Sequence, residues 1–527
     1  MVQRRQFLRW LGSAAVGVGC SGRAAPPAPS EPEPPADPDV DVAPEVDPAP
    51  EPTAPTRPAT DADWARLAEQ LDGRLVRPDA PDYATARLLF DPRFDDLRPA
   101  GIAYCASESD VQRSIAFARD HGLPFAARCG GHSYGGYSSG AGLVCDVSPL
   151  STVRVDAAGG AAVLGAGARL IDIYAGLAAR GLALPGGSCP SVGIAGLTLG
   201  GGQGVLSRKL GLTCDALSSL RIVTADATIH ACDAGRDDDL FWASRGGGGG
   251  NFGVATSFTF RADPVAELTR FALPWPWAAA ADVIAAWQSW GPDAPDELWS
   301  KCEIGARGGA ASIAVHGVYV GPPSALAPSL DALVRLVGSA PRRRSVEAAP
   351  LLESMLALGG CARRTLEECH LPPEGTLGRG IHLSRSDVFD APLPPAGITA
   401  LLEAMDRGGL EEGSGRIGLD AVGGAVNRVP ADATAFVHRG ARFIAQYATF
   451  WGRRATPAVV EASTRWLDRL YAAARPHASG FAYQNYIDPR LSDWAHAYYG
   501  ANLPRLRAIK ARHDPDGLFR FAQSIAP

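Results

Sequence analysis

The sequence is poor in cysteine, in unbalanced charge and in long apolar runs. Ten cysteines in 527 residues are too few for a disulfide scaffold, and no CxxC pair or His/Cys cluster has zinc spacing. A net charge of −6, with 50 basic and 56 acidic residues intermixed, argues against a general nucleic-acid binder. We therefore expect no metal site and no nucleic-acid partner. Cys361 and Cys369 lie close enough in sequence to pair if the protein is exported, but spacing alone leaves this open.

The N-terminus has the features of an export signal. Arg4-Arg5-Gln6-Phe7-Leu8 is a twin-arginine pattern, and the apolar run after it is too short for a transmembrane helix. An ordinary Sec signal is the alternative. Cys20 ends the run as a lipid-bearing cysteine would, although Gly17 stands where leucine is usual. We predict that residues 1–22 direct twin-arginine export, giving a periplasmic protein or, with a lipid on Cys20, a membrane-anchored lipoprotein.

A segment with almost no large apolar side chain follows the signal. Residues 23–60 are mainly Pro, Ala, Asp and Glu, and such a composition cannot bury enough surface to fold. We predict a disordered linker here. Its extended character would hold the rest of the chain away from a membrane if Cys20 were anchored.

Short helices and strands alternate after the linker. Ser107 is a predicted helix N-cap, and Gly181 ends a helix predicted over 169–180. Residues 142–147 read as a strand, and 220–232 as a hairpin. This mixture predicts an α+β nucleotide-binding domain. Hydrophobic residues make up 46% of the chain, which is long enough for a second domain.

Two glycine-rich stretches carry groups suited to cofactor chemistry. Residues 128–137 read Arg-Cys-Gly-Gly-His-Ser-Tyr-Gly-Gly-Tyr, in which Gly130 and Gly131 allow the backbone to approach a ligand closely beside His132. Residues 186–204 are also glycine-rich and contain Cys189. A third stretch, 483–488, reads Tyr-Gln-Asn-Tyr-Ile-Asp.

Together the three stretches resemble, in order, the motifs of the berberine bridge enzyme-like FAD-linked oxidases, and the resemblance runs from about residue 88 to 523. It implies a vanillyl-alcohol oxidase (PCMH-type) FAD-binding domain of two α/β subdomains at 61–263. It also implies a substrate domain at 264–480, with an antiparallel sheet backed by helices, and a return to the FAD domain at 481–527. In this family FAD is bound covalently by a histidine at the 8α carbon and a cysteine at C6, which correspond here to His132 and Cys189.

The resemblance implies a wider set of residues around the flavin. These are Arg128, Gly130, Gly131, Ser133, Tyr134, Val192, Gly193, Gly196, Gly200, Gly202, Gly204, Asn251, Gly253, Val254, Asn485 and Tyr486. Gly248, Gly250 and Gly253 also satisfy the spacing of a Rossmann fingerprint. That fingerprint must open a helix, whereas residues 254–260 alternate as a strand, so we do not predict a Rossmann site.

The resemblance also suggests catalytic groups. A tyrosine of the third motif acts as the base in relatives; we predict Tyr486, with Tyr483 as the reserve. Strand alternation over 483–488 would put Tyr483 and Asn485 on one face and Tyr486 on the other. A phenol has a pKa near 10, so the site is expected to lower it through a cation or hydrogen bonds. Gln446, on a strand predicted over 442–451, either faces the substrate or is an ordinary exposed strand residue.

The predicted function is oxidation of an alcohol-type C–H, with reoxidation by O2 to give H2O2. Val192 lies three positions after Cys189, where relatives carry a residue that gates O2, and its small size favours an oxidase. A sugar or oligosaccharide is the first substrate candidate, because the second domain is rich in Trp. The alternatives are a secondary-metabolite tailoring enzyme and a surface-tethered, non-catalytic binding protein. We expect a monomer.

Overall fold

The computed structural model describes residues 57–156, 160–406, 410 and 412–527. The predicted signal, Cys20 and the linker up to residue 56 lie outside these residues. Thr60, which we assigned to the linker, belongs to the folded part, because its hydroxyl caps helix α2 by accepting from Asp63 N. No helix in the described ranges is long and apolar enough to span a membrane.

The first domain begins with a four-stranded sheet in the order β1-β2-β4-β3, in which only β1 is antiparallel to its neighbour. Helix α4 packs on this sheet and is capped by Ser107 as predicted. The elements here are α2 (Asp61–Gln70), β1 (Arg74–Val76), α3 (Tyr83–Ala86), β2 (Gly101–Tyr104), α4 (Glu108–Asp120), β3 (Phe125–Arg128) and β4 (Leu143–Asp146).

A five-stranded antiparallel sheet follows, in the order β5-β6-β10-β8-β9. The predicted hairpin is present as β8 and β9. A strand follows the glycine run before residue 254, so the prediction against a Rossmann site is confirmed. The elements are β5 (Val153–Val155), β6 (Ala161–Gly165), α5 (Leu170–Ala178), α6 (Ile194–Leu199), α7 (Ser207–Leu210), β8 (Leu217–Val223), β9 (Ile229–Asp233), α8 (Asp238–Ala243) and β10 (Val254–Arg261), with a short pair β7 (Leu182–Ala183) and β11 (Asp263–Pro264).

The next domain is a seven-stranded antiparallel sheet in the order β15-β12-β14-β13-β17-β18-β16, backed by helices as predicted. Apolar side chains such as Ile417 and Leu419 pack with those of the helices in one core. The elements are β12 (Glu267–Trp275), α9 (Ala280–Trp290), β13 (Leu298–Arg307), β14 (Ala310–Tyr319), α10 (Pro323–Val337), β15 (Ser345–Pro350), α11 (Leu351–Leu358), β16 (Ile381–Phe389), α12 (Pro395–Asp406), β17 (Ser414–Ala421), β18 (Phe443–Trp451) and α13 (Pro457–Ala474). Cys361 and Cys369 form a disulfide between α11 and β16.

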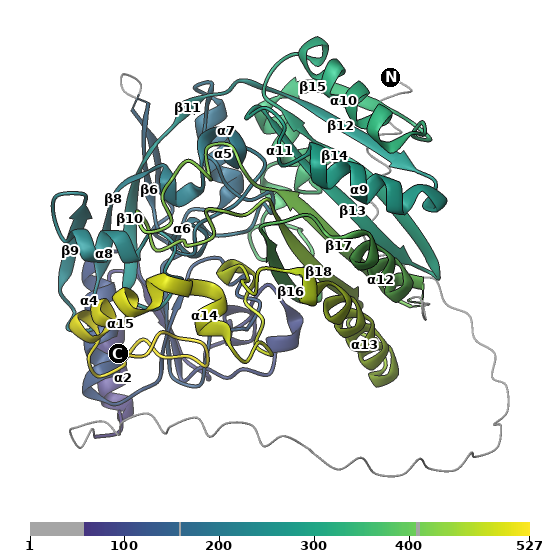
Figure 1. Ribbon diagram of the computed structural model, residues 1–527. Helices are drawn as coiled ribbons and strands as arrows, with labels where there is room; N and C mark the ends of the chain where they lie inside the picture. Colours follow the sequence, from purple (N-terminus) through teal and green to yellow (C-terminus); the bar gives the residue numbers. More distant parts are fainter. Residues whose placement is uncertain (1–56, 157–159, 407–409, 411) are drawn as a thin grey trace, which may run out of the picture.

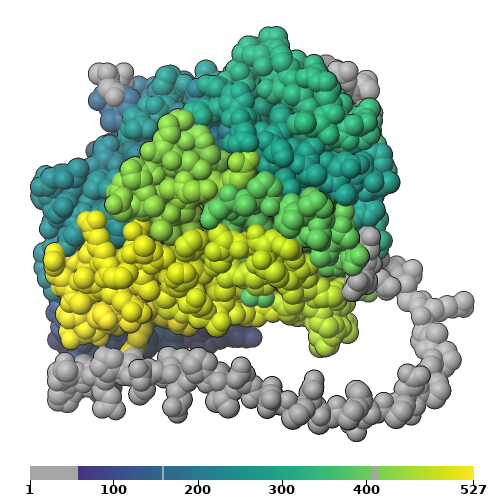
Figure 2. All heavy atoms as spheres, in the orientation of Figure 1, coloured from purple at the N-terminus to yellow at the C-terminus, as the bar shows by residue number. Residues whose placement is uncertain are grey.

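The C-terminal segment returns to the first domain. Figure 1 shows α14 (Trp494–Tyr499) and α15 (Leu503–His513) beside the first-domain sheets, and in Figure 2 the segment forms a continuous yellow band across the lower part of the visible face. Phe519 packs edge-on against Phe125 of β3 at 5.6 Å. Lys510 Nζ donates to Asn251 O and Phe519 O, both at 2.7 Å. The last residues therefore hold the glycine run before β10 in place.

A buried arginine joins the first domain to the seven-stranded sheet. Arg208 of α7 is 1% exposed, and its guanidinium donates to four backbone carbonyls, those of Pro292, Ala294, Leu298 and Val422. The glycine-rich stretch that leads into α7 is thereby fixed relative to the sheet.

Arg208→Met tests this link. The variant leaves the four carbonyls without their donor, so we expect the free energy of unfolding to fall by at least about 3 kcal/mol, measured by urea denaturation. Lys209→Met is the matched control, because the partly exposed pair between Lys209 and Glu297 contributes about 1 kcal/mol or less. Equal stability of the two variants would contradict the assigned role.

Candidate active site

A cavity of about 650 Å³ lies where the glycine-rich loops, the C-terminal return and the seven-stranded sheet meet. Most of the residues predicted around the cofactor and substrate line it, although they come from distant parts of the chain. These are Arg128, Gly130, Gly131, His132, Ser133, Tyr134, Cys189, Val192, Gly193, Gly196, Gly204, Gly253, Val254, Gln446, Tyr483, Asn485 and Tyr486.

Three predicted cofactor residues do not line the cavity, and each has a supporting role instead. A Cβ on Gly200 would lie 2.0 Å from Asn485 Oδ1, so the absence of a side chain lets Asn485 approach. Gly202, with φ of +84°, donates its N–H to Tyr483 Oη at 3.0 Å. Asn251 is buried, donates to Gly247 O and accepts from Ile525 N. Motif matching alone could not distinguish such second-layer contacts from lining positions.

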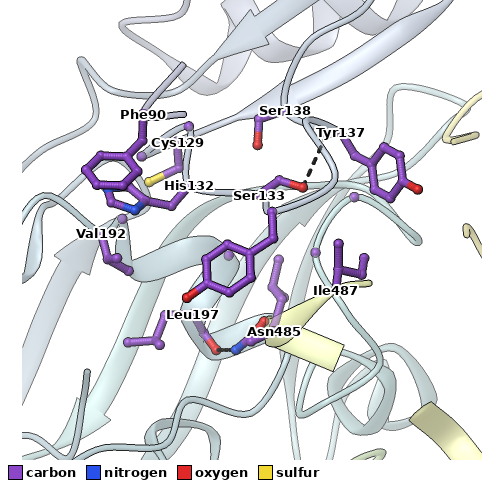
Figure 3. A pocket seen from close by; sticks show the side chains of 18 of the residues that line it. Phe90, Cys129, His132, Ser133, Tyr137, Ser138, Val192, Leu197, Asn485 and Ile487 are labelled. Atoms are coloured by element: carbon purple, nitrogen blue, oxygen red, sulfur yellow. Dashed lines mark hydrogen bonds between the residues drawn. The ribbon is translucent and has the colours of Figure 1, made fainter. Parts of the chain in front are cut away.

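His132 is held as a neutral imidazole. Its ring stacks on Phe90 with centroids 4.0 Å apart, as Figure 3 shows, and its Nε2 lies 2.9 Å from Ser191 Oγ. Burial lowers the pKa of His132 to about 3, and the positive charge of Arg169 adds to this. The imidazole therefore keeps a lone pair for bonding at any ordinary pH.

Cys189 lies in an exposed turn at the cavity wall. The surrounding wall raises the pKa of its thiol above the ordinary value, and Arg416 and Lys301 offset only part of this. At neutral pH the sulfur is a thiol and not the thiolate that would be the better nucleophile.

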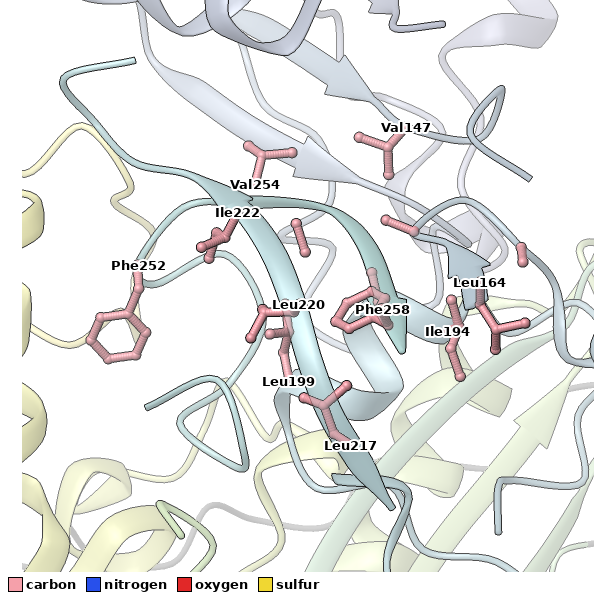
Figure 4. Packing of buried hydrophobic residues seen from close by; sticks show 14 of the residues in the cluster. Val147, Leu164, Ile194, Leu199, Leu217, Leu220, Ile222, Phe252, Val254 and Phe258 are labelled. Carbon is pink, nitrogen blue, oxygen red and sulfur yellow. The ribbon is translucent and has the colours of Figure 1, made fainter. Parts of the chain in front are cut away.

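The loop backbone fits a large, tightly held planar cofactor. A Cβ on Gly130 would lie 2.5 Å from Gly193 N, and one on Gly193 would lie 2.0 Å from Cys129 Sγ, so only glycines allow the two loops to come together. Ile194 and Leu199 anchor the second loop in the core, as Figure 4 shows. The lining of the cavity includes both glycine-rich loops and also Val254 at the start of β10.

Arg128 lines the cavity and is also paired within the protein. Its side chain is 4% exposed and forms a buried ion pair with Asp146 on the neighbouring strand β4. Its Nη1 is buried without a partner, as is Ser139 Oγ, and both residues line the cavity. Unpaired buried donors of this kind fit a ligand rich in acceptor oxygens.

The third motif is not an extended segment, so the predicted alternation is wrong. Residues Gln484–Tyr486 form a 3-10 turn, which brings Tyr483, Asn485 and Tyr486 to the same cavity. Tyr483 Oη accepts from Gly202 N at 3.0 Å, Gln203 N at 3.2 Å and Asn485 Nδ2 at 3.0 Å. Burial raises the pKa of Tyr483 to about 12, although these donors oppose the rise.

Tyr486 lies among aromatic rings. Its ring is 4.9 Å from that of Tyr483 and is parallel to that of Tyr134 at 5.9 Å. Burial raises the pKa of Tyr486 well above 10, and the carboxylate of Asp420 raises it further. The prediction that the site lowers this pKa is therefore wrong for the protein's own groups.

Gln446 faces the cavity, which agrees with the prediction that it faces the substrate and not with the alternative of an exposed strand residue. Its Nε2 lies 3.2 Å from Ser384 Oγ and 3.3 Å from Tyr134 Oη. Six further residues of the site were missed by sequence reasoning: Phe90, Ser191, Lys301, His382, Arg416 and Asp420. Alternation along β17 could have indicated Arg416 and Asp420, but polar residues alternating on a strand most often face solvent.

Comparison with known proteins agrees with this geometry. The family model for an FAD binding domain matches residues 99–233, and the model described as berberine and berberine like matches residues 482–526. The fold, the cavity and these matches define an FAD-dependent oxidoreductase.

Relatives specify the family further. The FAD-linked oxidoreductase YgaK of Bacillus subtilis is 34% identical over 466 residues, covering 87% of this chain and 98% of YgaK. The structure of Physcomitrella patens BBE-like 1 is 30% identical, with a TM-score of 0.78, covering 88% of this chain and 98% of that one. A chitooligosaccharide oxidase is 25% identical, with a TM-score of 0.79, over 88% and 99%. The chain belongs to the berberine bridge enzyme-like family of FAD-linked oxidases.

Gly130→Ala tests the fit of the loops to the cofactor. The new Cβ would force Gly193 away, so we expect the purified variant to carry much less FAD, measured as the ratio of flavin to protein absorbance. Gly452→Ala is the control, because Gly452 does not line the cavity and an added Cβ there would have nothing within 4 Å. Full FAD content in Gly130→Ala would show that the close contact is not required.

Proposed function

We propose that this protein oxidises an alcohol-type C–H, with a sugar or oligosaccharide as the first substrate candidate, and that O2 is the final acceptor. FAD supplies the hydride acceptor and passes the electrons to O2, which gives H2O2. The observation that carries the proposal is that His132, Cys189 and Tyr486, from three distant segments, line one cavity. The similarity to a chitooligosaccharide oxidase supports the choice of a sugar.

We propose that FAD is bound covalently through both His132 and Cys189. If His132 Nε2–H donates to Ser191 Oγ, the lone pair stays on Nδ1, which is then the bonding atom. The stacked Phe90 ring fixes the plane of the imidazole. Cys189 bonds only after losing its proton, because its thiol is the dominant form at neutral pH. Each new bond would replace one C–H bond of the flavin with loss of its proton, and the two electrons released would reduce the flavin, which O2 would reoxidise to give H2O2.

We propose Tyr486 as the group that takes the substrate hydroxyl proton. Tyr483 Oη already accepts from three donors, whereas no described group hydrogen-bonds the Tyr486 hydroxyl. Since a free phenolate is disfavoured here, Tyr486 must give up its own proton as it receives that of the substrate. Asp420 has the largest charge effect on the pKa of Tyr486, and its Oδ2 is buried without a partner among the described residues. We propose that this carboxylate finally receives the Tyr486 proton through a bridging water, since no hydrogen bond joins the two groups directly.

Val192 supports an oxidase. It lines the cavity in the same loop as Cys189, and its short side chain leaves room for O2. We also propose that residues 1–22 direct twin-arginine export, that Cys20 can anchor the chain to a membrane, and that the protein acts as a monomer. A secondary-metabolite alcohol is the alternative substrate.

The two covalent bonds should differ in their dependence on pH. Apoprotein is mixed with FAD between pH 6 and 8. In His132→Ala only Cys189 can bond, and the rate of bond formation should rise about tenfold per pH unit, because the thiolate fraction rises tenfold per unit below the raised pKa. In Cys189→Ala the rate should stay constant, because a pKa of about 3 keeps His132 neutral throughout. Intact-protein mass spectrometry after acid precipitation measures both. Absence of any covalent flavin would contradict this part of the proposal.

Tyr486→Phe tests the proton acceptor. Anaerobic stopped-flow reduction of the flavin should slow about 10²-fold or more, with little change in substrate binding. Tyr483→Phe is the comparison, and we expect a smaller kinetic effect but weaker retention of FAD, because three donors lose their acceptor. The opposite pattern would assign the proton transfer to Tyr483.

The substrate class is tested by peroxide release in air. The wild-type protein is assayed against a panel of mono- and oligosaccharides and a panel of aromatic and aliphatic alcohols. Peroxide from sugars supports the first candidate, and peroxide only from non-sugar alcohols supports the alternative. If the protein carries a full complement of FAD and no compound of either panel reduces the flavin, the result would contradict the proposed reaction.

A further inference from the structure

The cavity-facing side of the seven-stranded sheet carries charged residues in a defined register. On β17, Arg416, Gly418 and Asp420 alternate with Ile417 and Leu419, which are buried in the core beneath the helices. Because side chains alternate along a strand, Arg416 and Asp420 share the opposite face, and both line the cavity. On the neighbouring strand β13, Lys301 lies opposite Asp420 and Glu303 opposite Gly418.

Three of these four charged residues are paired within the protein. Lys301 Nζ lies 3.1 Å from Asp420 Oδ1. The aliphatic part of Lys301 lies close to Gly418, where an added Cβ would be 3.2 Å from its Cδ, so the glycine lets the ammonium reach Asp420. Glu303 lies 3.7 Å from His316 Nε2.

Arg416 is different. Among the described residues its guanidinium has no hydrogen bond and no ion pair within 4 Å, and its close contact is the Phe450 ring, 5.1 Å from its Cζ. It is half-buried and lines the cavity. Its charge acts on Cys189 and Tyr134 of the cavity wall, and on Glu303 of the neighbouring strand β13, whose close partner is His316. The ring contact holds the guanidinium plane and leaves its donors free for a ligand.

We propose that Arg416 binds a carboxylate of the substrate, so that the enzyme prefers an acidic saccharide to its neutral counterpart. This inference rests on the proposed oxidation of a sugar and narrows its substrate class. A planar guanidinium with free donors matches a carboxylate in two parallel hydrogen bonds, and the partial desolvation of the cavity strengthens them.

The strand fixes how far the carboxylate lies from the oxidised carbon. Arg416 and Asp420 are four residues apart on β17, so their Cα atoms are about 13 Å apart. In the proposed mechanism Asp420 lies at the end where Tyr486 takes the substrate proton, because its charge acts on the Tyr486 phenol. The carboxylate therefore belongs to the sugar ring next to the oxidised one, as in a disaccharide with a neutral reducing ring and a uronic acid as the second ring.

The test compares cellobiouronic acid with cellobiose, which share the reducing glucose and differ in one carboxylate. In wild-type enzyme we expect kcat/KM for the acid to exceed that for cellobiose by at least about tenfold. Arg416→Gln should raise KM for the acid by at least about tenfold and bring the ratio of kcat/KM for the acid to kcat/KM for cellobiose close to one. Arg416→Lys should restore part of the loss, because it keeps the charge without the paired donors. Arg453→Gln, a substitution in a largely exposed pair with Asp95, is the control and should change neither.

Two outcomes separate failure of this inference from failure of the sugar-oxidase proposal. If cellobiose is oxidised but the acid has no advantage, or if Arg416→Gln affects both sugars equally, the inference is overturned and the proposed function stands. If neither sugar reduces the flavin, binding is followed by the change in flavin absorbance on titration with cellobiouronic acid. If cellobiouronic acid binds the wild-type protein but not Arg416→Gln, the result supports the carboxylate site. If cellobiouronic acid does not bind the wild-type protein, the proposed carboxylate site is overturned.

Discussion

The hydroxyl of Tyr483 is the contact on which the site depends. It accepts hydrogen bonds from the backbone of Gly202 and Gln203 and from Asn485, and so ties the C-terminal return to the second glycine-rich loop. The same loop carries Cys189 and, through Ser191, orients His132. One phenol oxygen thereby holds together segments about 280 residues apart. Because the Tyr483 hydroxyl already accepts these three hydrogen bonds and the Tyr486 hydroxyl accepts none from the described residues, Tyr486 is the better candidate for proton transfer.

Burial keeps most of the reactive groups of the cavity in their neutral forms. It lowers the pKa of His132 and raises those of Cys189 and Tyr486, while the fixed charges of Lys301, Arg416 and Asp420 lie on the sheet opposite. A neutral imidazole is ready to bond, whereas a thiol and a phenol each need a partner that removes a proton. The neutral groups lie on the loops and the C-terminal return, and the fixed charges lie on the sheet across the cavity.

The FAD-binding fold was predictable because three motifs, in order, resemble those of a known family. The same resemblance implies His132 and Cys189 as covalent ligands, and the structure places both side chains at one cavity. The motifs also implied Gly200, Gly202 and Asn251 as residues around the flavin, but these three residues contact the cavity-lining segments and do not line the cavity themselves. Sequence reasoning also failed for the third motif, where a 3-10 turn replaced the expected strand. In each case the position of the residue depends on a contact with a segment far away in the sequence, and a local sequence pattern does not contain that contact.

By itself, the sequence determined the class of cofactor and the family fold, since long motifs in a fixed order carry both. Only the tertiary structure decided which phenol is free of hydrogen bonds, that the pKa of Cys189 is raised, and that Arg416 lines the cavity with no ion pair within 4 Å among the described residues. A pKa and an unpaired charge depend on everything that packs around a group. Pairing of β17 with β13 brings Lys301 beside Asp420 from more than 100 residues away, and pairing of β17 with β18 adds neighbours from a nearer segment.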